Sequence, residues 1–168
     1  MLPVGLHALS EGPVETAAVV EVGDPALDGL EFTLRKPLTV RGRLMESGPG
    51  RYFWRGSLET LIDTTCRRCL TPLSVPVAVE VEALFTDDAA VDDPAAYPIA
   101  PHAAELVLDD MVREELLLAV PGFPLCRQEC RGLCPRCGKD LNVGPCACEP
   151  EPDPRWAALR ALEEQGPH

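Results

Sequence analysis

Eight cysteines are the residues of this chain whose spacing most clearly predicts chemistry. A thiolate is a soft ligand that suits tetrahedral zinc, and a two-residue gap lets two sulfur atoms meet one ion across a tight turn. The spacing therefore predicts metal binding. The cysteines occur as Cys66-x2-Cys69 and, after 56 intervening residues, as Cys126-x3-Cys130-x3-Cys134-x2-Cys137-x8-Cys146-x-Cys148.

The stretch Cys134-Pro135-Arg136-Cys137-Gly138 has the form of a zinc knuckle. Proline fixes the entry to the turn, and Gly138 tolerates the positive φ that lets backbone N–H groups point at sulfur. We expect zinc here, or iron in vitro. Free thiols or a disulfide-stapled loop are the alternative, which the absence of a signal-like segment disfavours. A redox role stays open, because zinc thiolates and resolving thiols share the C-x-x-C form.

The number of metal sites does not follow from the spacing alone. Cys66 and Cys69 lie at the tip of a predicted hairpin and need two more sulfur atoms from elsewhere. One site with spare thiols is therefore an alternative to two sites, so one or two zinc ions are expected. The grouping that we favour is Cys134, Cys137, Cys146 and Cys148 in one site and Cys66, Cys69, Cys126 and Cys130 in the other.

The segments that must position these cysteines have a β-rich pattern. Valines at 75, 77, 79 and 81 alternate with Pro76, Ala78, Glu80 and Glu82, which is the period of a strand with one polar face. A turn is expected at 45–50, and an antiparallel meander is the simplest arrangement. Strands are predicted over 14–22, 38–45, 51–64 and 73–85.

Helices are predicted at two places in the second half. Leu108, Val112 and Leu116 share one face of a segment that Pro121 ends, and Asp109 is the expected N-cap. A second helix should begin at Asp153. Residues 86–102 have no apolar period and predict an exposed acidic loop.

These elements predict an α+β fold in two parts. Residues 1–122 form a mostly antiparallel sheet with the C-x-x-C hairpin and a short packed helix. Residues 123–168 form a Cys-rich zinc-knuckle segment and the C-terminal helix. The second part has too little apolar material for a core, so a metal ion must organise it.

Charge is distributed unevenly along the chain. The 15 basic and 27 acidic residues give a net charge of −12, which disfavours broad nucleic-acid binding. Residues 80–115 hold eleven acids and one base, whereas the cysteine motifs are locally basic. These cations either offset the charge of a four-thiolate zinc site or form a phosphate-contacting face. The candidates for RNA contact are Arg67, Arg68, Arg127, Arg131, Arg136 and Lys139.

The residues do not predict an enzyme. His7, His102 and His168 form no pair by spacing, and all-cysteine zinc sites have no open position for water. No apolar stretch approaches the roughly 20 residues that span a bilayer. The first residues lack the basic and apolar pattern of a targeting peptide. We expect a cytoplasmic protein without a membrane or small-molecule partner.

Several motifs together resemble the YceD family of large ribosomal RNA subunit accumulation proteins. They are Cys66-Arg67-Arg68-Cys69-Leu70, an acidic linker, the helix 112–121, the string from Cys130 to Asn142 with its G-L-C-P-x-C-G-x-x-L-N pattern, and Asp153-Pro154-Arg155-Trp156. The chain departs from the family at 106–108, where Leu-Val-Leu replaces Ile-Asp-Leu. Some relatives lack much of the 126–148 cysteine set, so zinc there would fold the segment rather than be the activity.

This resemblance implies a role in producing, processing or stabilising large-subunit ribosomal RNA. We expect a non-enzymatic ribosome-biogenesis factor whose partners are precursor large-subunit ribosomal RNA or early assembling ribosomal proteins. One alternative is an acidic escort that binds a basic ribosomal protein through residues 87–93. Another is a zinc-thiolate redox switch.

Overall fold

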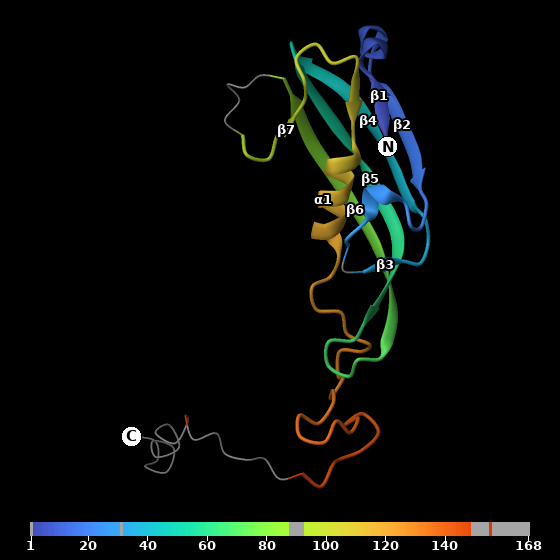
Figure 1. Cartoon of the computed structure of the whole chain (residues 1–168), viewed down its shortest axis with the longest axis vertical. Coiled ribbons are helices and arrows are strands. Elements are labelled where there is room, and N and C mark those ends of the chain that lie inside the picture. Colours follow the sequence, from blue (N-terminus) through green and yellow to red (C-terminus); the bar gives the residue numbers. More distant parts are fainter. Residues whose placement is uncertain (1, 31, 88–92, 149–154, 156–168) are drawn as a thin grey trace.

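A computed structural model describes residues 2–30, 32–87, 93–148 and 155 of the chain. The molecule is elongated, with a long twisted sheet at one end and the cysteine-rich segment at the other (Figure 1). The predicted C-terminal helix lies outside the described residues. In the part of the chain that is described, no helix is long and apolar enough to cross a membrane.

The described elements are mostly strands. Two short 3-10 helices, η1 and η2, and one α-helix accompany them. Their bounds are β1 (Pro3–Gly5), η1 (Leu6–Glu11), β2 (Val14–Val20), η2 (Pro25–Leu27), β3 (Thr33–Leu34), β4 (Leu38–Gly48), β5 (Arg51–Thr65), β6 (Pro72–Thr86), β7 (Tyr97–Pro98), β8 (Glu105–Val107) and α1 (Asp109–Ala119).

The strands form a mostly antiparallel main sheet in the order β2-β4-β5-β6-β7, and β3 also pairs with β5. Only the short β6–β7 pairing in this described sheet is parallel. The predicted α+β class with a mostly antiparallel sheet is confirmed. The division of the chain at 122/123 stays a prediction.

The core covers one face of this sheet, as the period of two predicts. Val77 and Val81 of β6 are buried, whereas Ala78 and Glu80 on the opposite face are exposed. Trp54 of β5 is fully buried and its indole N–H donates to the Thr16 hydroxyl at 2.9 Å. The sheet therefore holds its largest side chain by packing and by one satisfied polar contact.

Two glycines make room for this indole. Gly42 of β4 and Gly56 of β5 are paired across the sheet, and both backbones lie against the Trp54 ring. A Cβ on Gly56 would overlap the Arg41 carbonyl oxygen and come within 2.6 Å of the ring. Only glycine fits without displacing the ring or the strands.

Helix α1 packs on β6 and buries Met111, Val112 and Leu116 (Figure 1). Asp109 is not the N-cap, which corrects the sequence expectation. Leu108 occupies the N-cap position without a side-chain cap, and the Asp109 carboxylate instead accepts a 2.6 Å hydrogen bond from the Leu2 backbone N–H. The carboxylate thus joins the helix to the N-terminal segment.

Four short strands escaped prediction from the sequence. β1 and β8 form a separate two-stranded sheet, and β3 and β7 add to the main sheet. β7 lies inside the predicted acidic loop 86–102, where Tyr97 packs on Phe85 with ring centroids 5.2 Å apart. The predicted turn at 45–50 is shorter than expected, because β4 continues to Gly48 through a bulge.

The β5–β6 hairpin positions the first cysteine pair. The two strands stay paired from Arg51 opposite Thr86 to Thr65 opposite Pro72. The hairpin runs past the end of β4 and carries residues 66–71 in its turn, toward the cysteine-rich segment (Figure 1).

We predict that Gly56→Ala lowers the free energy of unfolding by about 1–3 kcal/mol, because the methyl group overpacks the Trp54 contact. Urea denaturation followed by tryptophan fluorescence measures this change. Gly144→Ala is the matched control, since a Cβ there meets nothing within 4 Å, and it should change stability by less than about 0.5 kcal/mol. Equal stability of the two variants would contradict the conclusion that only glycine fits against the Trp54 ring at this position.

Candidate metal centres

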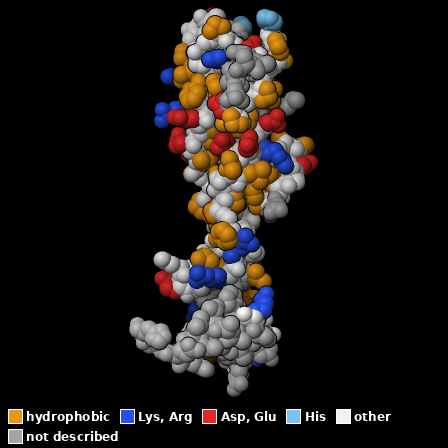
Figure 2. Space-filling view, turned by 90° about the vertical axis from the view of Figure 1, so that its left-hand side faces the viewer, with side chains coloured by type: hydrophobic (Ala, Val, Ile, Leu, Met, Phe, Trp, Pro, Cys, Tyr) orange, Lys and Arg blue, Asp and Glu red, His pale blue; other side chains and the backbone are white. Residues whose placement is uncertain are grey.

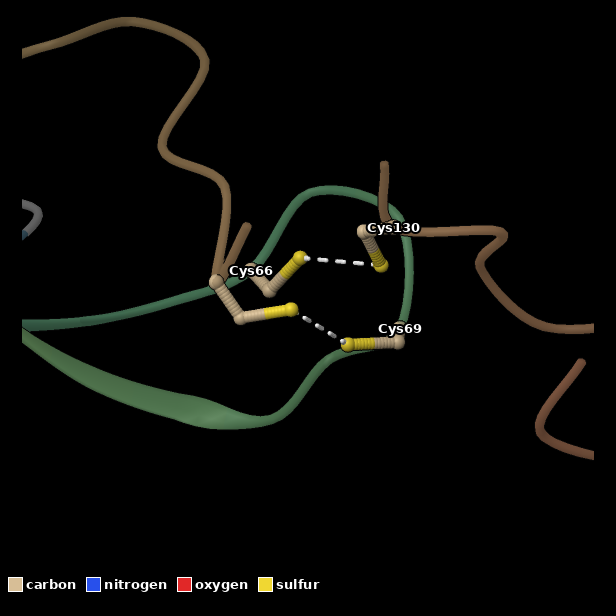
Figure 3. Close-up of side chains that lie close together, drawn as sticks. Cys66, Cys69 and Cys130 are labelled. Atoms are coloured by element: carbon tan, nitrogen blue, oxygen red, sulfur yellow. Dashed lines mark hydrogen bonds between the residues drawn. The ribbon is translucent and has the colours of Figure 1, made fainter. Parts of the chain in front are cut away.

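The first group of thiols joins two segments that lie far apart in the sequence. Cys66 and Cys69 come from the β5–β6 turn, and Cys126 and Cys130 come from the segment that follows α1. Their four sulfur atoms lie within 4.8 Å of one another. Figure 3 shows the labelled sulfur atoms of Cys66, Cys69 and Cys130 pointing toward a common centre.

The sulfur separations fit a tetrahedral metal. Zn–S bonds of about 2.3 Å in a tetrahedron place neighbouring sulfur atoms about 3.8 Å apart, whereas a disulfide needs about 2.05 Å. The distances are 3.8 Å between Cys66 and Cys130 and 3.6 Å between Cys69 and Cys126. None of the eight cysteines forms a disulfide. The sulfur distances therefore give the first group the geometry of a metal centre with four cysteine ligands.

The second group is local in the sequence. Cys134, Cys137, Cys146 and Cys148 also lie within 4.8 Å of one another. The structure thus brings the eight thiols together in the two groups that we favour from the sequence, a partition that the spacing alone does not fix. Each group could hold one metal ion.

The two C-x-x-C turns have the same backbone conformation. Gly138 has φ 71° and donates its N–H to the Cys134 carbonyl oxygen at 2.9 Å. Leu70 has φ 60° and donates its N–H to the Cys66 carbonyl oxygen at 2.9 Å. The sequence reveals this turn only where glycine marks the positive φ, since leucine rarely adopts it.

Backbone N–H groups stabilise one thiolate in each group. Burial opposes ionisation of Cys66, but N–H groups of Cys126, Cys69 and Arg68 outweigh it and lower the pKa of Cys66 to about 6. N–H groups of Cys137 and Arg136 lower the pKa of Cys134 to about 6. This is the effect that knuckle turns have on a metal-binding sulfur.

One other thiol in each group has a raised pKa. Burial and the neighbouring sulfur atoms raise the pKa of Cys126 to about 12. The Cys137 sulfur and burial raise the pKa of Cys148 to about 12. Four adjacent thiolates repel one another, so full ionisation of either group requires a bound cation.

Further groups orient the sulfur atoms of the first centre. The Thr71 hydroxyl lies 3.2 Å from the Cys69 sulfur. The Asn142 amide lies 3.5 Å from the Cys130 sulfur and also donates to Asp140 at 2.7 Å. The Asn142 oxygen accepts the Arg131 backbone N–H at 2.8 Å. Asn142, which lies between the cysteines of the second group in sequence, therefore supports the first centre.

Arg68 locks the hairpin turn against the knuckle segment. Its guanidinium donates to the Cys130 carbonyl at 2.8 Å, and its own carbonyl accepts the Leu133 N–H at 3.0 Å. Gly132, at φ 73°, packs so closely that a Cβ would lie 2.8 Å from the Arg68 carbonyl oxygen. Sequence reasoning missed this contact, because nothing local to either segment signals the other.

The six basic residues singled out from the sequence all lie on the hairpin turn or in the cysteine-rich segment and are exposed. Arg67 donates to the Gly122 carbonyl at 3.0 Å and Lys139 donates to the Pro145 carbonyl at 2.7 Å. Arg136 also has a partner within the protein. Together with Arg68, four of the six basic residues thus have partners within the protein. Within the described residues, Arg127 and Arg131 are therefore the members of this set whose guanidinium groups are most available to a partner.

Comparison with known proteins identifies the family. The model of the family described as "Large ribosomal RNA subunit accumulation protein YceD" matches residues 54–163. The chain belongs to the YceD family. The matched region includes the hairpin turn and all eight cysteines, and the family description supports a general role in ribosome biogenesis.

Similar curated proteins come from mycobacteria and are described as uncharacterized. Those of Mycobacterium tuberculosis and Mycobacterium bovis are each 34% identical over 105 residues, covering 61% of this chain and 50% of the relative. A Mycobacterium leprae protein is 30% identical over 110 residues, covering 62% and 49%. The chain thus spans about half the length of the curated relatives it matches. No solved structure is significantly similar to it.

We predict that the purified protein binds about two zinc ions per chain, one in each group. Cys69→Ser should leave about one ion, held by the second group, and Cys137→Ser should leave about one ion, held by the first. Elemental analysis and the charge-transfer spectrum of the cobalt-substituted protein measure the occupancy. A single ion in the unmodified protein would favour one site with spare thiols and contradict the two-centre arrangement.

Proposed function

We propose that this protein is a non-enzymatic ribosome-biogenesis factor that contacts precursor large-subunit ribosomal RNA through the basic surface around its two cysteine groups. The observation that carries the proposal is the location of this surface. Six of the 15 Lys and Arg residues lie on the hairpin turn or between residues 126 and 139, although the chain has a net charge of −12. We call these six residues the basic end.

An acidic protein with one basic end binds a polyanion in a defined orientation. Figure 2 shows Lys and Arg side chains at the narrow part of the molecule and also over the broad part that contains the sheet, where most of the Asp and Glu side chains in this view lie. The acidic body repels phosphate and the basic end attracts it. This arrangement confines RNA to the end that the cysteines organise.

Zinc is the metal that we propose for both groups. Eight sulfur ligands in two closed sets leave no position for substrate, so the ions would be structural and not catalytic. Zinc would fix the hairpin turn and the knuckle segment in one arrangement. Metal-binding cysteines must stay reduced, so eight of them suit a reducing compartment, which supports a cytoplasmic location within this proposal.

Arg127 and Arg131 are the residues that we expect to contact phosphate most directly. We predict that the double variant Arg127→Glu/Arg131→Glu weakens binding to precursor large-subunit RNA. The plot of log affinity against log salt should become shallower by roughly 1.4, because each lost phosphate contact on single-stranded RNA contributes about 0.7 to the slope. Filter binding over a range of salt concentrations measures both quantities.

The matched control is Lys36→Glu/Arg41→Glu, which makes the same change in net charge at exposed positions next to and on β4. It should leave the salt slope unchanged. If both double variants alter binding equally, the effect is one of overall charge and the basic end is not the contact surface.

A second candidate function rests on the acidic face of the sheet domain. A hollow of about 390 Å³ is lined by Glu82, Glu114 and Glu115 together with Tyr97 and Leu118. Burial raises the pKa of Glu115, and the adjacent Glu114 raises it further. Such a face suits a basic ribosomal protein. Most of the acidic stretch 87–93 lies outside the described residues.

Nuclease treatment separates the two candidates. An RNA-contacting factor loses its ribosomal partners when a pull-down from cells is treated with ribonuclease. An acidic escort keeps a basic protein under the same treatment.

A further inference from the structure

An exposed aromatic ring stands beside the basic end. Phe123 lies in the connector between α1 and Cys126, and 80% of its surface is accessible. Burying a ring of this size is favourable, so a partner that covers Phe123 would gain free energy from its burial.

One face of this ring is already occupied by an arginine. The Arg67 guanidinium carbon lies 5.1 Å from the centre of the Phe123 ring, within the range of a cation–π contact. Arg67 is itself held in place, since its side chain donates to the Gly122 carbonyl at 3.0 Å and its backbone N–H donates to the Pro124 carbonyl at 2.9 Å. These bonds hold Arg67 against the backbone on either side of Phe123.

A hollow adjoins the pair. Its volume is about 410 Å³, and it is bounded by the ends of β5 and α1 and by the connector. The Thr64 and Thr65 side chains offer hydroxyl groups there, and Leu117 and Val120 offer apolar surface. Among the described residues that line the hollow, Arg67 carries the charge, so the hollow has a cationic edge.

We propose that Phe123 is a stacking platform for an unpaired base of RNA, with Arg67 beside it as a cationic support. Stacking of a base on an aromatic ring next to a positively charged groove is the usual way to bind single-stranded nucleic acid. The local charge favours an anionic partner over an apolar helix, because four bases and one acid lie between residues 126 and 139. The exposed aromatic ring in turn favours a nucleic-acid base over an acidic peptide, because every base has a π-face that stacks on it. This inference rests on the proposed function and names the part of RNA that the basic end takes.

Base stacking and phosphate contacts have different signatures. Phosphate contacts set the salt dependence of binding, whereas stacking contributes affinity that salt does not change. A duplex hides its bases, so the platform should distinguish an unpaired strand from a duplex of the same composition.

The test measures binding of the zinc-loaded full chain to a short single-stranded oligonucleotide taken from precursor large-subunit RNA, and to the corresponding duplex. Phe123→Ala should weaken binding of the single strand about 5-fold to 100-fold and leave the salt slope unchanged. Phe123→Tyr should retain binding, and Phe123→Leu should behave like alanine, because leucine keeps apolar bulk but has no π-face.

Val143→Ala is the matched control, since Val143 is another exposed apolar residue of the cysteine-rich segment, 84% accessible. It should leave binding unchanged. Zinc content of every variant shows that the metal groups are intact. A base replaced by 2-aminopurine in the oligonucleotide should lose fluorescence on binding the unmodified protein and not on binding Phe123→Ala.

The outcomes separate the inference from the proposed function. If Phe123→Ala binds RNA as well as the unmodified protein while Arg127→Glu/Arg131→Glu does not, the stacking platform is wrong and the proposed function stands. If Phe123→Ala loses a protein partner in a nuclease-treated pull-down and keeps RNA affinity, the surface docks protein and the inference is overturned. If the unmodified protein binds neither RNA, both fail.

Discussion

The cysteine-rich end of this molecule depends on the meeting of sulfur atoms from two segments that are distant in the sequence. The β5–β6 hairpin extends beyond the end of β4, and the segment after α1 folds back onto the hairpin turn. Little apolar surface joins them, because the small cluster there consists of Cys66, Cys69 and Cys130 with Leu73 and Leu133 packed against it. A shared metal ion is the interaction that can hold such a junction.

The sheet and the cysteine junction solve different physical problems. The main core packs one face of a long antiparallel sheet around Trp54 and under α1, and its stability follows from buried apolar area. The junction has no comparable area, so it relies on ligands, on backbone N–H groups aimed at sulfur and on the hydrogen bonds of Arg68 and Asn142. The six residues of the basic end come from both segments, so their relative placement depends on this junction.

Much of the fold could be predicted from the sequence where the signal is local. The alternating valines of β6 predict a strand with one buried face, and the motif from Cys134 to Gly138 predicts a knuckle. The pairing of three-residue β1 with β8 could not be predicted, because strands so short carry no period. Asp109 looked like a cap from its neighbours alone, whereas its partner, the Leu2 N–H, lies 107 residues away.

The candidate site divides in the same way. The ligand types and the two C-x-x-C pairs can be identified from spacing, and so can the excess of cations around them. The parts that couple the segments cannot. Arg68 reads in sequence as a surface cation, yet it bonds the backbone at Cys130, and the turn at Leu70 lacks the glycine that would mark it.

Amide hydrogen exchange with and without zinc tests the central claim most directly. The Leu133 N–H, bonded to the Arg68 carbonyl, and the Arg67 N–H, bonded to the Pro124 carbonyl, report on the closed junction. If metal holds the junction, chelation should abolish protection at both amides. The amides of β4, β5 and β6 in the main sheet should stay protected. Unchanged protection of Leu133 and Arg67 in the metal-free protein would contradict the account.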